Sequence, residues 1–216
     1  MKILALDTTS KLASVSLLID GNLVGTKYND NQKTHSERVI PMMEELLKEN
    51  GITPRDIDLF GVTIGPGSFT GIRIGVATIK GMAQALGKQV VGVTTLEAMA
   101  YIESDSFVCS MIDARHDNVY IGLYDENKNK VFEDCLNIDE AIEKLQGKKV
   151  DFVGDGAIIH STRLSEVFDG RIEEAKDISE RLAYITNEKN ENAQNPHEIK
   201  PIYLRKAEPE RKGEKI

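Results

Sequence analysis

The feature that most constrains this sequence is a glycine- and proline-rich loop at residues 65–71, which reads Gly-Pro-Gly-Ser-Phe-Thr-Gly. The apolar run 59–64 before the loop is short and rich in β-branched and aromatic residues, which predicts a strand. Residues 72–86 after the loop are predicted to form a helix in which the strongly polar side chains are confined to one narrow edge. A helix that is apolar almost all round must be covered on two sides. One side should face its own sheet, and what covers the other side becomes the central question.

The glycine loop has two interpretations. Because glycine has no Cβ atom, backbone N–H groups of the loop could approach an anion at the positive end of the helix that follows. The loop is also suited to a plain packing turn. Neither this loop nor the Gly-Asp-Gly at residues 154–156 ends in the Gly-Lys-Ser/Thr of a P-loop. The sequence therefore favours structural turns over phosphate sites at both places.

The order of the predicted elements indicates an internal duplication. Three strands, a helix, a strand, a helix and a strand follow one another, and a similar order begins again at residue 107. This order is typical of a mixed sheet with an antiparallel hairpin on one side and right-handed parallel crossovers on the other. We predict a first domain at 1–104, a smaller second domain at 105–200 and a charged tail at 201–216, whose return to the first domain stays open. The predicted strands span 3–6, 12–19, 23–28, 59–64 and 89–93, then 107–112, 119–124, 130–133 and 149–153, and the predicted helices span 34–47, 72–86, 94–101, 139–145, 158–164 and 179–186.

Two capping boxes predict where helices begin. Thr34 is followed three residues later by Glu37, and Thr94 is followed by Glu97. Pro41 lies inside the first of these helices and lacks an N–H group, so the helix either begins close to residue 38 or is kinked.

Composition limits the classes of function. The formal net charge of -8 over 216 residues argues against a stand-alone nucleic-acid binder, which needs a clustered basic face. Basic residues in the tail are interleaved with glutamates, which predicts a solvated tail rather than a tRNA contact. Cys109 and Cys135 lack metal-ligand spacing and are expected to be reduced packing residues. We predict a cytoplasmic protein without membrane contact, because the chain lacks a signal peptide and a run of spanning length. The basic tail residues are Arg205, Lys206, Arg211 and Lys212.

Several local sequences carry a family resemblance. They are residues 3–8 (Ile-Leu-Ala-Leu-Asp-Thr), residues 65–75, residues 113–115 (Asp-Ala-Arg) followed by Val-Tyr at 119–120, and residues 201–205 (Pro-Ile-Tyr-Leu-Arg). Over nearly the whole chain the sequence resembles the bacterial TsaB family, also called YeaZ. The resemblance implies an α/β fold of the duplicated actin-like (ASKHA, ribonuclease-H-like) type, with mixed sheets flanked by helices.

The resemblance also implies a function and partners. TsaB-like chains are non-catalytic partners of the TsaD subunit, which with the TsaE ATPase transfers threonylcarbamoyl to an adenosine amine beside the tRNA anticodon. No cofactor is then expected on the isolated chain, whereas ATP or ADP could bind in the complex, and tRNA would be met only through the complex. In actin-like ATPases the first hairpin wraps phosphate with glycines, which are missing after Asp7 here. The candidate nucleotide contacts are Asp7, Thr8, Gly65, Gly67 and Ser68.

Departures from the catalytic relative argue against catalysis by this chain. TsaD-like chains hold a metal ion with a His-x-x-x-His pair, whose positions here are Thr95 and Met99, neither of them a plausible ligand. We therefore expect no metal and no catalytic residue. A sugar- or acetate-kinase-like phosphotransferase stays as an alternative, and it would require nucleotide binding by the isolated chain. A glycoprotease-like peptidase is a remote alternative, because adjacent side chains such as those of His160 and Ser161 point apart.

An association surface is predicted on the two helices at 34–47 and 72–86. If they lie side by side on the sheet, their outward faces form an apolar patch with small residues, which marks an interface. The alternative is that the second half of the same chain covers this patch. By resemblance the patch docks the equivalent helices of TsaD and, in its absence, a second copy of this chain, and Gly75→Arg or Ala77→Glu would block pairing while leaving the monomer folded. The predicted interface residues are Val39, Met42, Met43, Ile74, Gly75, Ala77, Thr78, Gly81, Met82 and Ala85.

Overall fold

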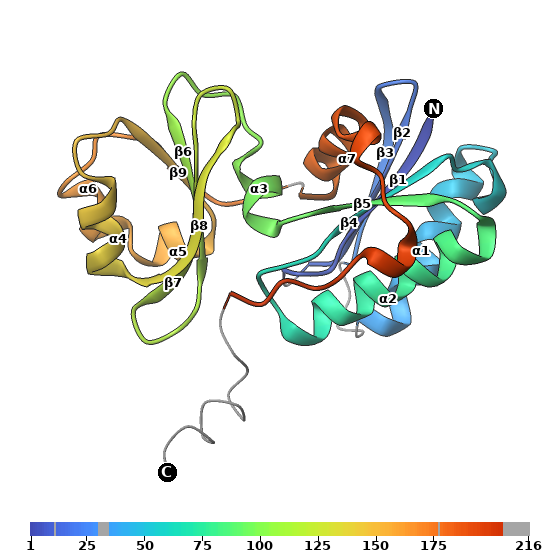
Figure 1. The fold of residues 1–216 in the computed structure, drawn as a ribbon, viewed down its shortest axis with the longest axis horizontal. Helices are drawn as coiled ribbons and strands as arrows, with labels where there is room; N and C mark the ends of the chain where they lie inside the picture. The colour runs from blue at the N-terminus through green and yellow to red at the C-terminus, as the bar shows by residue number, and fades with distance from the viewer. Residues whose placement is uncertain (11, 30–34, 177, 205–216) are drawn as a thin grey trace, which may run out of the picture.

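The chain folds into two lobes, each built on a five-stranded mixed sheet (Figure 1). The computed structural model describes residues 1–10, 12–29, 35–176 and 178–204. The strand order is β3-β2-β1-β4-β5 in the first sheet and β8-β7-β6-β9-β10 in the second, when the second is read from β8. The two orders match strand for strand, which confirms the predicted duplication.

The pairing and direction of the strands follow the predicted topology. In the first sheet β1 (Lys2–Asp7) pairs antiparallel with β2 (Ser14–Ile19), which pairs with β3 (Asn22–Tyr28), while β4 (Leu59–Thr63) and β5 (Gln89–Val93) are parallel to β1. The second sheet repeats this pattern, with a short β10 that was not predicted. Its strands are β6 (Phe107–Asp113), β7 (Asn118–Tyr124), β8 (Lys130–Asn137), β9 (Val150–Val153) and β10 (Ile172–Glu173).

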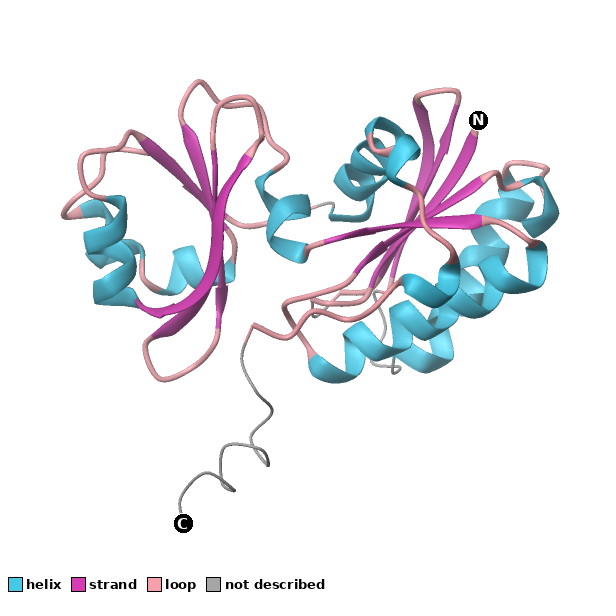
Figure 2. Cartoon of the chain, in the orientation of Figure 1, coloured by secondary structure: helices cyan, strands magenta, loops and turns pink. Residues whose placement is uncertain are grey.

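Helices cover the sheets from both sides (Figure 2). None of the helices in the described ranges combines the length and the apolar character needed to cross a lipid bilayer. The α-helices are α1 (His35–Glu49), α2 (Phe69–Leu86), α3 (Thr95–Ala100), α4 (Ile138–Leu145), α5 (Asp155–Ile159), α6 (Ser161–Ser165) and α7 (Ile178–Glu188). Short 3₁₀ turns in the described ranges are η1 (Pro54–Asp56), η2 (Asn190–Asn192) and η3 (Pro196–Glu198).

Alternate residues of β1 face two different cores, as the pleat of a strand requires. Leu4 and Leu6 are buried with α1 and α2 on one face of the first sheet. Ile3 and Ala5 face the other side, where α7 packs. The sequence assigned the segment of α7 to the second domain at 105–200, but its contacts place it on the first sheet. An amphipathic helix shows in its sequence that one face is buried, and not which sheet buries that face.

The two lobes share a core through α3. Ala98 and Met99 of α3 pack with Val108 and Tyr124 of the second sheet, in the same cluster that holds the α7 face of the first sheet. The opposite face of the second sheet is covered by α4, α5 and α6. The second lobe therefore contacts the first through α3 and does not cover the outward face of α2.

Helix starts agree in part with the predicted caps. Thr94 Oγ1 accepts the N–H of Glu97 at 3.1 Å, as predicted for the start of α3, while the Glu97 carboxylate pairs with Lys189. The cap predicted at Thr34 lies outside the described residues. The chain is helical on both sides of Pro41, so α1 does not begin near residue 38. At α2, Ser68 Oγ accepts the N–H of Gly71 at 3.2 Å, and the helix begins three residues earlier than predicted.

The segment after α7 returns along the first lobe beside α2 (Figure 1). We call residues 190–204 the C-terminal strap. Gln194 forms an isolated antiparallel bridge with Val90 of the edge strand β5. Lys80 of α2 donates to the carbonyl oxygen of Ile199 at 2.9 Å, and the Ile199 side chain is buried in the first-lobe core. In the described part of the predicted tail, Ile202 donates its N–H to the carbonyl oxygen of Ile64 at 2.7 Å, so residues 201–204 return to the first domain.

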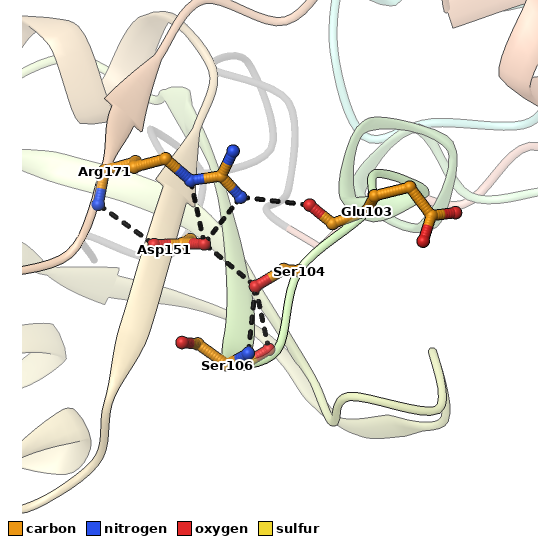
Figure 3. A network of polar contacts seen from close by, with 5 residues as sticks. All are labelled: Glu103, Ser104, Ser106, Asp151 and Arg171. Atoms are coloured by element: carbon orange, nitrogen blue, oxygen red, sulfur yellow. Dashed lines mark hydrogen bonds and ion pairs between the residues drawn. The ribbon is translucent and has the colours of Figure 1, made fainter.

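A polar network fixes the linker between the lobes (Figure 3). The Asp151 carboxylate accepts hydrogen bonds from Ser104 Oγ at 2.8 Å and from Arg171 Nη2 at 2.8 Å. Arg171 also donates to the carbonyl oxygen of Glu103 at 3.0 Å. Because Asp151 is on β9 and residues 103–106 precede β6, the network ties the linker to β9 of the second sheet.

Candidate functional site

The loop between β4 and α2 packs against its own chain. Gly65 and Gly67 have φ angles of 103° and 149°, which favour glycine. A Cβ atom on Gly67 would stand 2.6 Å from the carbonyl oxygen of Thr9, and one on Gly65 would stand 2.6 Å from that of Ile202. The two glycines are needed because the β1–β2 turn and the C-terminal strap approach the loop closely. This contact supports the structural-turn interpretation of the loop.

The carboxylate of Asp7 is occupied by neighbouring donors. Asp7 is fully buried, and its Oδ1 accepts from Thr9 N at 3.0 Å, Thr9 Oγ1 at 2.6 Å and Thr63 Oγ1 at 2.6 Å. Its Oδ2 accepts from Ser10 at 3.1 Å. Thr8 donates its hydroxyl to the carbonyl oxygen of Gly71 at 2.7 Å. The polar candidate nucleotide contacts Asp7, Thr8 and Ser68 are therefore hydrogen-bonded to neighbouring residues of the chain, and Gly65 and Gly67 pack against it.

The two positions that hold the metal-binding histidines in TsaD-like chains are buried here. Thr95 and Met99 are 2% and 3% exposed. A Cβ atom on Gly154 would stand 2.2 Å from the Cε atom of Met99, so the Met99 side chain fills the space beside this glycine. Among the described residues, no three His, Cys, Asp or Glu side chains are grouped closely enough to hold a metal ion.

The predicted interface residues on α2 fall into three groups. Ala77, Gly81 and Ala85 are exposed, and Ile74, Thr78 and Met82 are half-buried, with Ile74 and Met82 packed against the first-lobe core. Gly75 is buried, and a Cβ atom there would stand 2.2 Å from Thr8 Oγ1. The variant Gly75→Arg would therefore disturb the packing of α2 on Thr8, so it cannot test pairing alone as expected from the sequence. The exposed outward face of α2, which we call the α2 face, consists of Thr70, Arg73, Ala77, Gly81, Gln84 and Ala85.

The predicted interface residues on α1 are wrong. Val39, Met42 and Met43 are at most 1% exposed and belong to the first-lobe core. Met42 lies three residues after Val39 and four before Leu46, which places all three on one side of a helix. Ile40, beside Val39 in the sequence, is 42% exposed.

Two aromatic residues at the edge of the α2 face were missed. Phe69 of α2 and Tyr203 of the C-terminal strap are stacked, with ring centroids 4.3 Å apart and an interplanar angle of 15°. Arg73 lies over the Phe69 ring at 4.9 Å and donates from Nε to the Tyr203 hydroxyl at 3.2 Å. Phe69 and Tyr203 are separated by most of the chain, so no local sequence pattern indicates that they meet.

The chain is similar to known proteins along most of its length. Residues 25–202 match the family model TsaD, tRNA N6-adenosine threonylcarbamoyltransferase. The chain is 31% identical over 226 residues to the tRNA threonylcarbamoyladenosine biosynthesis protein TsaB of Bacillus subtilis, covering 98% of this chain and 97% of that protein. It is 35% identical over 168 residues to TsaB of Escherichia coli, covering 72% of each.

Solved structures agree with these relatives. YeaZ from Pseudomonas aeruginosa has a TM-score of 0.78 at 26% identity, and the match covers 94% of this chain and 100% of that one. The activator of 2-hydroxyisocaproyl-CoA dehydratase from Clostridium difficile, solved with bound ADPNP, has a TM-score of 0.57 at 12% identity and shows likeness of fold alone. The two-lobed architecture is thus the duplicated actin-like fold expected from the sequence.

Proposed function

Because this chain belongs to the TsaB family of tRNA threonylcarbamoyladenosine biosynthesis proteins, we propose that it is a non-catalytic subunit that binds and supports a TsaD-like catalytic subunit. That subunit would transfer threonylcarbamoyl to the adenosine next to the tRNA anticodon. The observation that carries the proposal is the α2 face, where Ala77 and Gly81 leave the helix backbone open to a second helix. Helices pack closely where such small residues lie at the contact.

A non-catalytic role is supported by the chemistry of the buried sites. Asp7 is satisfied by four donor groups, and Met99 fills the space beside Gly154. A catalytic carboxylate or metal ligand has to present free lone pairs to a substrate or an ion. Asp7 and Met99 are buried in the folded chain, so neither is open to a substrate or an ion, and we assign the chemistry of the complex to the partner subunit.

Further partners follow from the same assignment. We propose that a TsaE-like ATPase and tRNA engage the assembled complex rather than this chain alone, and that any ATP or ADP binds in the complex. In the absence of the TsaD-like subunit, a second copy of the chain would occupy the α2 face as a homodimer. Homodimer and heterodimer would then compete for one surface, and both would act in the cytoplasm without a membrane.

Light scattering after gel filtration tests the proposal. The chain would be measured alone and then mixed with a TsaD-like subunit from the same organism, and the dissociation constant of the mixed complex would follow from titration. Ala77→Glu places a charge at the centre of the α2 face and should weaken pairing at least about 10-fold, because an unpaired charge is costly to bury. Thr162→Glu is a matched control, since Thr162 is exposed on α6 of the second lobe.

The outcomes separate clearly. A mixed complex that is weakened by Ala77→Glu and not by Thr162→Glu supports the proposal. A chain that does not associate with the TsaD-like subunit, or an Ala77→Glu variant that pairs as tightly as the wild type, would contradict it. Thermal unfolding checks the folding of both variants, whose unfolding midpoints should equal that of the wild type.

A further inference from the structure

A guanidinium group held by two aromatic rings stands where the C-terminal strap meets the α2 face. Arg73 lies 4.9 Å from the centroid of the Phe69 ring and 6.0 Å from that of Tyr203, and its Nε donates to the Tyr203 hydroxyl at 3.2 Å. We call Phe69, Arg73 and Tyr203 the Arg73 cluster. Stacking on rings and one hydrogen bond restrict the orientation of the guanidinium before any partner binds.

The charge of Arg73 has no counterion within the described part of the chain. Ten ion pairs form among the described residues, and Arg73 takes part in none of them. No described residue accepts a hydrogen bond from its two Nη groups either. Arg73 and Tyr203 are both exposed. No described residue therefore occupies the planar pair of Nη donors, and a carboxylate matches its geometry with two parallel hydrogen bonds.

The position of the cluster relates it to the α2 face. Arg73 is one helical turn before Ala77, on the same side of α2, so a helix laid on Ala77 and Gly81 would pass close to the guanidinium. Arginine and tyrosine are enriched among the residues that dominate interface energies. The neighbours of Arg73 on this face, Ala77 and Gly81, are small and uncharged, as at the centre of a protein interface.

We propose that the Arg73 cluster is a second docking point for the partner subunit and that Arg73 binds a carboxylate of that subunit. This inference rests on the proposed function, because it assigns one specific contact to the same surface. A protein carboxylate is favoured over a nucleic-acid phosphate, since the formal net charge of the chain is -8 and the α2 face offers a single cation among the described residues.

The C-terminal strap is part of this docking point. Tyr203 reaches Phe69 because the strap is anchored at two residues just before it. Ile199 is buried in the core, and Ile202 donates its N–H to the carbonyl oxygen of Ile64 at 2.7 Å. Ordering Arg73 in the free chain reduces the side-chain entropy lost on association. Removal of the Tyr203 ring should therefore weaken binding even though the charge of Arg73 is retained.

Titration of the full chain with a TsaD-like subunit, at low and at high salt, tests the proposal. Arg73→Gln should raise the dissociation constant about 10- to 100-fold and flatten its salt dependence, because the variant loses a charge-assisted contact. Arg73→Lys should recover only part of the loss, since an ammonium group cannot form the same paired hydrogen bonds. Tyr203→Ala should weaken binding about 10-fold.

Two controls match these variants. Arg55→Gln removes an exposed arginine at the 3₁₀ turn η1, and Tyr184→Ala removes a tyrosine on α7 that is 36% exposed, against 39% for Tyr203. Both should bind within about two-fold of the wild type. Because Arg73 is exposed, its variants decide the question even if Tyr203→Ala loosens the strap.

The outcomes distinguish this inference from the proposed function. If Ala77→Glu prevents pairing and Arg73→Gln binds like the wild type, the docking helix stands and the Arg73 contact is overturned. If neither variant changes binding, the proposed function fails with it. If Arg73→Gln leaves subunit pairing intact and weakens tRNA binding by the assembled complex, the cluster serves a phosphate and the carboxylate proposal is overturned.

Discussion

The carbonyl oxygen of Thr8 lies only 1.9 Å from the point where a Cβ atom on Gly71 would stand, and the Thr8 hydroxyl donates to the Gly71 carbonyl oxygen at 2.7 Å. The first turn of α2 is thus pressed against the end of β1. The atom that a Cβ on residue 71 would meet belongs to the backbone of Thr8, and this backbone cannot move aside as a flexible side chain would. Gly71 has to be glycine for α2 to lie where it does.

The substitution Gly71→Ala should lower the free energy of unfolding by about 2–3 kcal/mol, at the upper end of the usual cost of an overpacked core. Gly81→Ala is the matched control on the same helix, because no atom lies within 4 Å of its Cβ position. That change should raise stability by about 0.5–1 kcal/mol through helix propensity. Urea unfolding followed by circular dichroism measures both. Equal stability of Gly71→Ala and the wild type would show that α2 shifts freely.

Much of the fold could be predicted from the sequence because its signals are local. The apolar run of β1, the alternation of β2, the Asp-Gly turn at residues 20–21 and the glycine loop all act within a few residues. The repeat of the element order then determined the two matching sheets. The placement of α7 could not be predicted, since Ile178, Leu182 and Ile185 would suit either sheet equally well.

The candidate surface shows the same division. The exposure of Ala77 and Gly81 was predicted, because small residues along one side of an apolar helix suggest close approach. The burial of Met42 could have been predicted from its spacing to Val39 and Leu46. The contact between Phe69 and Tyr203 could not, because it depends on the path of the C-terminal strap, and that path is set by tertiary contacts such as the burial of Ile199.

Acid should weaken the network that holds the interlobe linker. Burial of Asp151 opposes its ionisation, but hydrogen bonds from Arg171 and Ser104 outweigh that effect and lower the pKa of the carboxyl below its ordinary value of 3.8. A lowered pKa in the folded state means that this carboxylate contributes its full stability above the unfolded pKa. The contribution is lost as the pH falls below that value and through the lower folded pKa.

The test compares the wild type with Asp151→Asn. We expect the variant to be less stable by about 1–2 kcal/mol at neutral pH, a value limited by the exposure of the Arg171 side chain. The difference should stay constant down to about pH 5 and shrink below about pH 4. Urea unfolding at several pH values measures it. A difference that grows on acidification would contradict the assigned direction.

One carboxylate joins the lobes across the α3 contact. Glu133 Oε1 accepts the Tyr124 hydroxyl at 2.5 Å and also accepts the hydroxyl of Thr94 at the start of α3. Burial, and after it the charge of Glu133, raises the pKa of the Tyr124 phenol, so the phenol stays protonated and remains a donor. Tyr124 and Glu133 belong to the second lobe and Thr94 to the first, so this carboxylate is shared between them.

Tyr124→Phe should cost about 1 kcal/mol of stability, the usual net value of one hydrogen bond. Thr94→Ala should cost about 2 kcal/mol, because it removes the helix cap of α3 as well as the bond to Glu133. Since both donors share one oxygen, the double variant should deviate from the sum of the single changes. Additive effects in a double-mutant cycle would show that the two hydrogen bonds are independent.

The isolated chain should not bind ATP or ADP with measurable affinity. A phosphate at the β4–α2 loop would need the space next to Gly65 and Gly67, and the carbonyl oxygens of Ile202 and Thr9 already lie there. Carbonyl oxygens repel a phosphate, and Ser68 N, which could otherwise bind one, donates to the carbonyl oxygen of Thr9 at 2.8 Å. Calorimetric titration of the isolated chain with ATP and Mg²⁺ should therefore give no heat of binding at any ratio tested.

Stoichiometric binding would require the strap or the β1–β2 turn to leave the loop, and it would favour a phosphotransferase over a scaffold subunit. Repeating the titration with the assembled complex then tells whether a site forms only when the partner is present.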